Sequence, residues 1–280
     1  MTKFNFWNFK HALDDYFFEL VNLLLKGIFF FKSLTGQYSY MKKNKDLLSI
    51  HKGKRVFIVG NGPSVKQQDL KLLKGEVTFF VNRAFKHEDY TYIQPTYHVF
   101  VDPKLASGEW KISMLDEILK KNPNVTFLLN SKWYYLDKFQ PYINNSKYRI
   151  YWLNTSLFLT PFYKHRTLEL TKITYGAAVI GQAIVSAIYM KADRVYLLGV
   201  ESTGFCNELL KQDSHFYGTN PENNEKNIQD IYKDLYFNYI HIKNLFYFSL
   251  YCKQEGYIIY NCTIGGILNM FERKKYEELF

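Results

Sequence analysis

The sequence predicts an α/β protein built on a Rossmann-like, mostly parallel sheet. From residue 54 onward, short apolar segments of strand length alternate with longer segments whose apolar residues have helical spacing. The first apolar segment also runs directly into a glycine-rich turn, "VFIVGNGPSV". Strands that alternate with helices are typical of a parallel sheet covered by helices on both faces, so we expect that architecture here.

Each expected strand is short, apolar and bounded by polar or turn-forming residues. The expected strands are residues 55–60, 77–82, 96–102, 124–130, 194–200 and 257–263. The expected helices between and after them are residues 63–73, 111–121, 174–190 and 231–256. The small residues of "TYGAAVIGQAIVSAIYM" predict a helix that packs tightly on the sheet, and Gly256 is expected to end the last helix.

Two stretches break this alternation. Residues 131–166 are aromatic and irregular, and residues 202–226 are polar and rich in turn-forming residues. Long segments of this kind are often functional, so we expect both to form lids over a ligand site. The chain is therefore expected to consist of an N-terminal amphipathic helical extension, residues 1–50, and one main domain, residues 51–280.

The N-terminal extension contains an apolar stripe with helical spacing. Its members are Leu13, Phe17, Leu20, Leu24 and Ile28. The apolar run is interrupted by Lys26 and is too short to span a bilayer, which needs about 20 apolar residues. We expect the stripe to pack on the main domain or on a second subunit. A contact with the membrane surface, assisted by the basic segment 41–45, is the alternative.

Composition restricts the partners and the compartment. The net charge of +10 favours anionic partners, but no nucleic-acid recognition motif accompanies it, so no nucleic acid is expected. The three cysteines form no CxxC pair and no signal peptide is evident, which predicts a cytoplasmic protein, peripheral at the inner membrane if its first helix binds lipid. No zinc-ligand spacing and no DxD pair is present, so neither a metal nor a cofactor is expected.

The glycine-rich turn predicts an anion-binding site. A strand, a turn and the start of a helix bring main-chain N–H groups and the positive end of the helix dipole to one place. The dinucleotide fingerprint, however, needs a glycine where this chain has Val65 and an acid where it has Asn82 and Arg83. Three interpretations stay open: a nucleotide phosphate, the extra phosphate of NADP, or a tight turn without a ligand.

Other polar residues follow the expected strands at their carboxyl ends, where parallel sheets bind ligands. They are Asn61, Asn82, Asp102, Asn130 and the segment 201–203. Thr174, Tyr175 and Gly176 open the helix of small residues and offer hydroxyl groups and main-chain donors. Neutral amides and hydroxyls suit a base and a sugar better than a bare metal ion.

Five segments carry a family resemblance. They are "VFIVGNGPSV", "FFVNRAF", "ITYGAAVIGQAIVSAIYMKADRVYLLGVES", "DSHFYG" and "GYIIYNCTIGGILNMF". In order and spacing they resemble the bacterial lipooligosaccharide sialyltransferases of glycosyltransferase family 42. The resemblance implies a sialyltransferase-like variant of the GT-A fold, a CMP-activated keto-acid sugar as donor (sialic acid, Kdo or a related nonulosonic acid), no metal, and inversion at the anomeric carbon.

The resemblance also implies roles for individual residues. The donor-binding set would be Asn61, Gly62, Ser64, Asn82, Asp102, Thr174, Tyr175, Gly176 and Tyr217. His215 would be the general base, and the near-neutral pKa of an imidazole suits that task. His98 lies inside an expected strand, where a buried structural role is expected instead.

We therefore expect a metal-independent, inverting glycosyltransferase of surface glycan synthesis (lipooligosaccharide or capsule), with a CMP-sugar donor and a glycan acceptor. A homo-oligomer is expected as well. Two alternatives stay open: a nucleotide-binding scaffold without transfer activity, and an NADP-dependent oxidoreductase.

Overall fold

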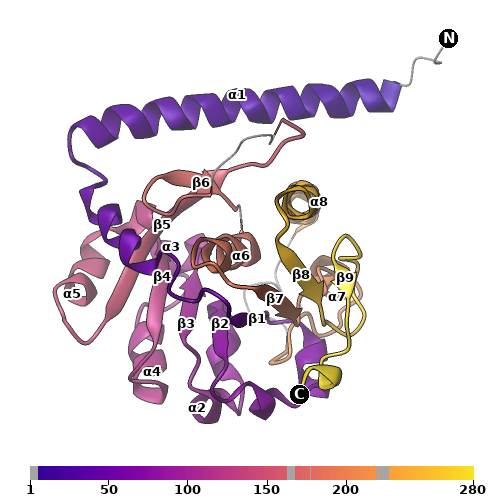
Figure 1. Ribbon diagram of the computed structural model, residues 1–280. Coiled ribbons are helices and arrows are strands. Elements are labelled where there is room, and N and C mark those ends of the chain that lie inside the picture. The colour runs from indigo at the N-terminus through magenta and orange to yellow at the C-terminus, as the bar shows by residue number, and fades with distance from the viewer. Residues whose placement is uncertain (1–5, 163–167, 177, 219, 221–226) are drawn as a thin grey trace.

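A nine-stranded parallel sheet forms the centre of the protein (Figure 1). The computed structural model describes residues 6–162, 168–176, 178–218, 220 and 227–280. The strands in these ranges are β1 (Arg55–Val59), β2 (Val77–Val81), β3 (Tyr97–Phe100), β4 (Thr126–Asn130), β5 (Arg149–Leu157), β6 (Ile173–Tyr175), β7 (Arg194–Leu198), β8 (Ile258–Asn261) and β9 (Glu272–Arg273). All of their pairings are parallel, which confirms the predicted α/β class.

The strand order reverses beside β1. The sheet runs β6-β5-β4-β3-β2-β1-β7-β8-β9, so the chain builds one side of the sheet from β1 to β6 and then returns to place β7 on the other side of β1. In doubly wound sheets, ligands bind at the carboxyl ends of the strands where the order reverses. A ligand-binding site is therefore expected at the boundary between β1 and β7.

Helices cover both faces of the sheet, as the alternation predicts (Figure 1). One face packs against α6 (Val179–Tyr189) and α8 (Ile228–Glu255), and the other against α2 (Tyr90–Ile93) and α4 (Met114–Lys121). Alternate residues of β1 enter the two cores, Val56 and Ile58 on the first face and residues 57 and 59 on the second. Gly256 ends α8 in the left-handed conformation, as expected.

The helix expected over residues 63–73 is two short 3₁₀ segments instead. These are η2 (Pro63–Gln67) and η3 (Leu70–Leu73). Asp69 separates them because its side chain accepts a hydrogen bond from the main-chain N–H of Lys71 at 3.0 Å. Asp side chains compete with helical main-chain hydrogen bonds in this way, which shortens the helix.

The lid expected over residues 131–166 is wrong for the part of it that the structure describes. Strand β5 lies inside the sheet between β4 and β6, and the side chains of Trp133 and Phe139 are buried in the core. Several aromatic residues of the segment that was expected to be a lid, Trp133, Phe139 and Trp152, therefore build the core. Residues 163–167 lie outside the described residues. Of the second expected lid, 202–226, the structure describes a short helix, α7 (Gly204–Leu209), while residues 219 and 221–226 lie outside the described ranges.

The short elements complete the two layers. They are η1 (Ser39–Leu47), η4 (Asn82–Lys86), α3 (Pro103–Ser107), η5 (Ser131–Trp133), η6 (Asp137–Phe139), α5 (Gln140–Ile143) and η8 (Glu277–Leu279). η1 belongs to the main body, because the buried amide of Asn44 donates to the carbonyls of Trp152 at 2.8 Å and Leu170 at 2.7 Å. The N-terminal extension therefore comprises α1 (Phe6–Leu34) and does not reach residue 50.

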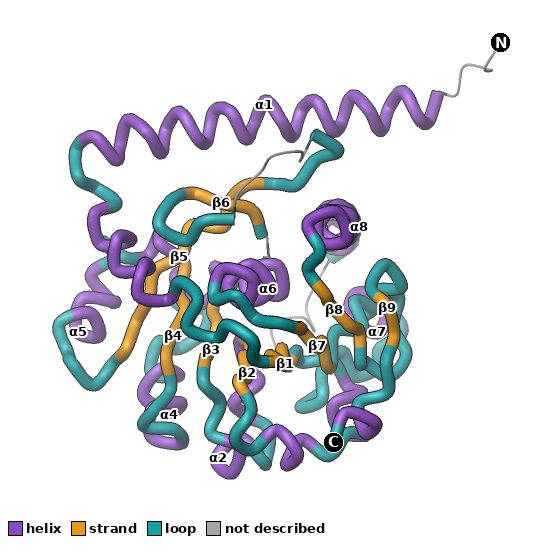
Figure 2. The backbone as a smooth tube through the Cα atoms, viewed as in Figure 1, coloured by secondary structure: helices purple, strands orange, loops and turns teal. Residues whose placement is uncertain are grey.

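Helix α1 lies across the outside of the α6 and α8 layer, and the segment after β5 rises to meet it (Figure 2). The side chain of Asn22 is fully buried there and pairs with the main chain of Phe158, donating to its carbonyl at 2.7 Å and accepting from its N–H at 2.9 Å. By contrast, the apolar stripe predicted to pack inward points away from the domain. Its five side chains are 51–60% exposed, so packing of the stripe on its own domain is ruled out. No helix in the described ranges is both long and apolar enough to cross a membrane.

We expect Asn22→Ala to loosen α1, because it removes both hydrogen bonds and leaves the N–H and carbonyl of Phe158 without partners. The cost should be about 1–3 kcal/mol, measured as faster hydrogen exchange and proteolytic cleavage within α1. The matched control is Leu24→Ala on the exposed face, which should stay within about 0.5 kcal/mol of the wild type. Equal protection of α1 in both variants would contradict this account of how the helix is held.

Candidate functional site

A pocket of about 230 Å³ lies at the junction of β1 and β7. Its walls come from the turn after β1, the segment after β7, the first residues of α6 and one residue of α8. The structure thus brings Asn61, Gly62, Asn82 and His215 of the predicted set together at the switch point of the sheet. Their roles in donor binding stay predictions.

The turn after β1 is held by a carboxylate from the end of β7. Oε1 of Glu201 accepts a hydrogen bond from the main-chain N–H of Ser64 at 2.7 Å. A methyl group on Gly62 would lie 1.4 Å from Oε2 of the same carboxylate, so only glycine leaves room for it. The second glycine of GNGPS is therefore explained by the close approach of Glu201.

This arrangement changes what the turn can bind. The N–H groups of Gly60, Gly62 and Val65 donate to main-chain carbonyls at 2.8 Å, 2.9 Å and 3.3 Å, and that of Ser64 donates to Glu201. The anion that the sequence predicts at this turn is thus the protein's own carboxylate in this structure. A ligand phosphate could use the N–H of Ser64 only after Glu201 moved away.

Two asparagine side chains line the pocket beside the turn. The amide of Asn61 donates to the carbonyl of Val81 at 3.2 Å. Asn82 follows β2 with a φ of 48°, a left-handed conformation that asparagine tolerates better than most residues. Its carbonyl accepts from Nε2 of the fully buried His98 at 2.7 Å, which anchors the main chain there. His98 is therefore the structural residue that the sequence predicts.

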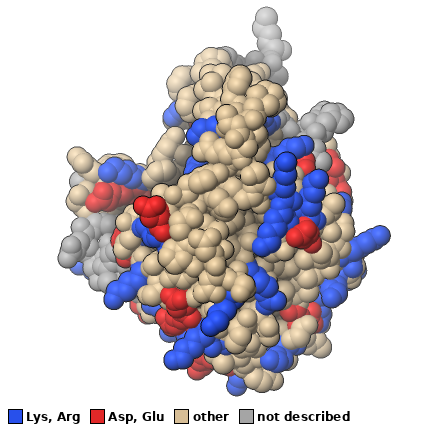
Figure 3. Space-filling model, turned by 90° about the vertical axis from the view of Figure 1, so that its left-hand side faces the viewer, with Lys and Arg blue, Asp and Glu red and all other residues tan. Residues whose placement is uncertain are grey.

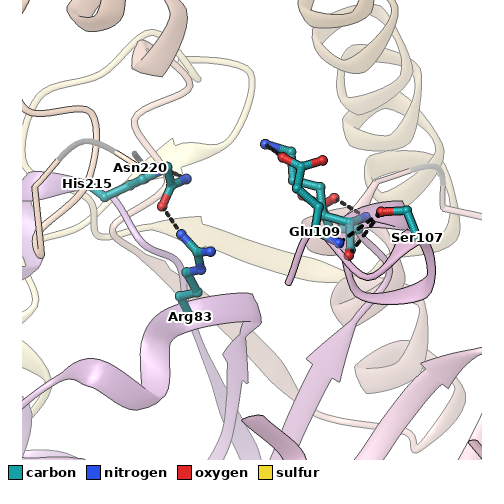
Figure 4. A network of polar contacts seen from close by, with 7 residues as sticks. Arg83, Ser107, Glu109, His215 and Asn220 are labelled. Carbon is teal, nitrogen blue, oxygen red and sulfur yellow. Dashed lines mark hydrogen bonds and ion pairs between the residues drawn. The ribbon is translucent and has the colours of Figure 1, made fainter. Parts of the chain in front are cut away.

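His215 is held in one protonation state by a chain of hydrogen bonds (Figure 4). Arg83 can only donate, and its Nη1 lies 2.6 Å from Oδ1 of Asn220. The amide NH₂ of Asn220 is therefore turned toward Nε2 of His215, 3.0 Å away, and Nε2 must accept. A neutral imidazole with its proton on Nδ1 follows. The ring of Tyr217 packs beside that of His215, with centroids 5.0 Å apart. Nζ of Lys86 lies 4.7 Å from the centroid of the Tyr217 ring.

Other predicted residues lie outside the pocket lining. Asp102 accepts from the N–H of Lys104 at 3.0 Å and caps α3. The hydroxyl of Tyr175 accepts from Lys26 of α1 at 3.1 Å, which ties it to the N-terminal helix. Thr174 and Tyr175 belong to strand β6 and do not open the helix as expected, since α6 begins at Val179. Thr174 and Ser64 are buried, and a Cβ added to Gly176 would lie 3.0 Å from the carbonyl oxygen of Gly181.

Two pocket residues escaped the sequence analysis. His241, from the middle of α8, lines the pocket, and burial lowers its pKa to about 4. Ser214 is buried at the pocket beside His215. A single histidine inside a long aromatic helix carries no motif, and only the packing of α8 over the switch point reveals it. In the described ranges, no group of three or more His, Cys, Asp or Glu side chains could hold a metal ion.

Comparison with known families places the chain in one of them. The sequence model of the family described as 6-hydroxymethylpterin diphosphokinase MptE-like matches residues 32–205, well over half of the chain, from the end of α1 into α7. The protein belongs to the MptE-like family. The resemblance to glycosyltransferase family 42 is therefore a wrong assignment: the GNGPS turn that suggested it lies within the matched MptE-like segment. Its short motifs describe a tight strand-to-helix turn, which unrelated doubly wound proteins can share.

One solved structure similar to this MptE-like chain is that of the MAf glycosyltransferase from Magnetospirillum magneticum AMB-1. It shares 13% sequence identity at a TM-score of 0.49, over 87% of this chain and 38% of that chain. The chain thus spans well under half the length of that glycosyltransferase. No curated protein matches the sequence.

A methyl group at Gly62 should test the Glu201 contact. Gly62→Ala must displace the carboxylate, and we expect the free energy of unfolding to fall by about 1–3 kcal/mol. In a double-mutant cycle, Glu201→Ala should destabilise the Gly62→Ala variant much less than it destabilises the wild type, because it also removes the clash between the added methyl group and the carboxylate. The control is Gly27→Ala in α1, where an added Cβ meets nothing within 4 Å. Strictly additive losses would contradict the proposed contact.

Buried histidines predict a loss of stability in acid. Burial lowers the pKa of His98 to about 3, below its unfolded value near 6.5, so the unfolded chain binds the proton first. Stability is complete above pH 6.5 and is lost as the pH falls toward 3, by about 1.4 kcal/mol per pH unit for each such group. Denaturant melts at several pH values should show this slope, and His98→Leu should reduce it. An unchanged slope in His98→Leu would show that His98 is not one of the groups responsible.

Proposed function

We propose that this protein is a transferase that moves a group from a nucleotide-activated donor to an acceptor hydroxyl at the β1–β7 pocket. One observation carries the proposal. Among the described residues, several buried polar atoms of the pocket wall have no hydrogen-bond partner: Oδ1 of Asn61, Oδ1 of Asn82, Oε2 of Glu201, Oγ of Ser214 and Nδ1 of His241. Buried polar atoms are costly to leave unpaired, so a polar ligand that satisfies them fits this place.

The chemistry of these atoms favours a ligand with several hydroxyl and amide donors, such as a sugar nucleotide. Amide oxygens, a hydroxyl and imidazoles are neutral partners for the hydroxyl and amide groups of a sugar and a base. The one carboxylate of the described pocket wall, Glu201, suits a ribose or sugar hydroxyl better than a phosphate. We therefore favour a CMP-activated sugar, such as a keto-acid sugar, over a triphosphate as the donor, and a glycan hydroxyl as the acceptor.

A second candidate rests on the family. The family description names a 6-hydroxymethylpterin diphosphokinase, and that name implies the transfer of a diphosphoryl group to 6-hydroxymethylpterin. In both candidate reactions, the hydroxyl group of an acceptor attacks a donor that is activated by a phosphate group. They differ in whether the sugar carbon or phosphorus is attacked, and the released nucleotide distinguishes them.

In the favoured reaction, the acceptor oxygen forms a bond to the anomeric carbon while the bond to the CMP oxygen breaks. The acceptor proton passes to Nε2 of His215, and CMP leaves as the phosphate anion. Nε2 accepts from Asn220 in this structure, so the base becomes available when that amide turns away. His241 stays neutral near pH 7 because burial lowers its pKa to about 4, and it is positioned to hydrogen-bond the ligand.

A donor panel tests the proposal. CMP should raise the melting temperature, and a ligand at 100 times its dissociation constant stabilises by about 2.7 kcal/mol. CMP release from CMP-sugars, compared with AMP release from ATP and 6-hydroxymethylpterin, identifies the reaction. Asn61→Ala should weaken the shift, whereas Asn130→Ala, at the end of β4 and outside the pocket lining, should not. No response to any nucleotide would contradict the proposal.

The histidine clamp gives a second test. We expect His215→Ala to lower turnover by about 10²–10⁴-fold with little change in nucleotide affinity. Asn220→Asp places a carboxylate beside the imidazole, which stabilises its charged form, so the acid limb of the pH–rate profile should move to higher pH. His11→Ala on the exposed part of α1 is the control. Wild-type turnover in His215→Ala would remove His215 from the mechanism.

A further inference from the structure

Helix α1 is docked through its polar side. Five of its polar side chains have partners in the domain, one of them His11, whose Nδ1 lies 3.5 Å from the hydroxyl oxygen of Tyr239. Asp15 pairs with Lys243 at 2.7 Å and accepts from the hydroxyl of Tyr247 at 2.6 Å. Glu19 accepts from Thr160 at 2.9 Å, and Asn22 and Lys26 make the contacts described above. A surface helix normally does the reverse and buries its apolar side.

The apolar side of α1 faces away from the domain. Ten large apolar side chains between Leu13 and Leu34 are each more than half exposed. Together they expose on the order of 1,000 Å², given about 150–250 Å² for each large side chain, and the largest patch on an ordinary monomer is about 300–600 Å². The specific polar docking on the inner side holds this surface outward, so its exposure is built into the fold.

The charges around this surface are arranged at its ends. Between His11 and Phe31, the exposed positions of α1 carry no Asp, Glu, Lys or Arg. Lys10 precedes the apolar surface and Lys32 lies in its last turn, before Leu34; both lysines are exposed, and Trp7 lies next to Lys10 with 64% of its surface exposed. In Figure 3, which looks at the molecule from the side where α1 ends, the top of the molecule is largely tan, while lysine and arginine are spread over the body below.

We propose that the outer face of α1 lies flat on an anionic phospholipid membrane, with its apolar side chains in the acyl boundary. Apolar side chains over a wide arc, lysines at the ends and a terminal tryptophan are what such an interfacial helix presents. Lysines near the surface also attract anionic lipid, and the chain has a net charge of +10.

A helix of a second copy covers less of this face. Leu13, Phe17, Leu20 and Leu24 alternate steps of four and three residues, which could form the narrow seam of a helix pair. The positions flanking such a seam are usually charged, but here only the half-buried Asp14 is charged, while Tyr16 and the residues at 23, 28 and 30 are uncharged and exposed. A bilayer covers the seam and its flanks together, so a lipid surface fits the observed face better.

Vesicle flotation of the full chain tests the proposal. The protein should float with vesicles of phosphatidylcholine mixed with phosphatidylglycerol, and less with phosphatidylcholine alone. Leu20→Glu combined with Leu24→Glu should weaken this by at least about tenfold, since two charges enter the apolar face. The matched control, Leu209→Glu combined with Leu210→Glu, changes two exposed leucines at the end of α7 and should float like the wild type.

The fluorescence of Trp7 reports directly on how deeply α1 inserts into the lipid bilayer. The other three tryptophans, at 110, 133 and 152, are buried, so a blue shift on adding vesicles and quenching by bromine-labelled lipid report on Trp7. Trp7→Phe should abolish both signals while flotation persists. Failure of the wild type to float would overturn the proposal, whether the protein is then monomeric or forms a dimer that the Leu20 and Leu24 changes dissociate.

Discussion

The carboxylate of Glu201 holds together the junction on which the rest of the structure depends. The carboxylate accepts a hydrogen bond from the main-chain N–H of Ser64 after β1, and the main-chain carbonyl of Glu201 accepts one from the N–H of Ile267 at 2.9 Å. Three segments that are far apart in the sequence therefore meet at one residue: the turn after β1, the end of β7 and the loop after β8. Because β7 pairs directly with β1, this contact lies at the point where the strand order of the sheet reverses.

The same contact determines how the pocket can recognise a ligand. A glycine-rich turn usually offers main-chain N–H groups to a phosphate, but here those groups are used within the protein. Side chains are therefore the groups that remain to contact a ligand there, and buried partners hold two of them: His98 donates to the carbonyl of Asn82, and Arg83 orients Asn220 against His215. The pocket is thus preorganised by buried polar contacts in its second layer, which is typical of sites that must hold a group in one protonation state.

The sequence predicts the sheet well because burial on both faces produces a local signal. The apolar runs of β1, β2 and β7, the small residues of α6 and the end of α8 at Gly256 all depend on neighbouring residues in the chain. The role of Glu201 depends on a contact across 137 residues, and that of His241 on how α8 packs, so neither leaves a local pattern. Strand β5 was not predicted because it lies in an aromatic segment that was expected to be a lid, and its residues show no clean alternation of apolar and polar side chains. The family assignment failed because it rested on five short segments, and the turn among them has a geometry that many folds share.

Helices α1 and α8 depend on each other in a way that the family boundary makes visible. The matched segment ends at residue 205, before α8 begins, and takes in only the last turn of α1. Lys243 and Tyr247 of α8 provide the cation and the hydroxyl that Asp15 needs when it is buried. The two helices are joined by these contacts and lie over the same face of the sheet. A chimera that kept α1 but took its last 75 residues from a relative without these partners would bury an unpaired carboxylate, so the two helices must be exchanged as a unit.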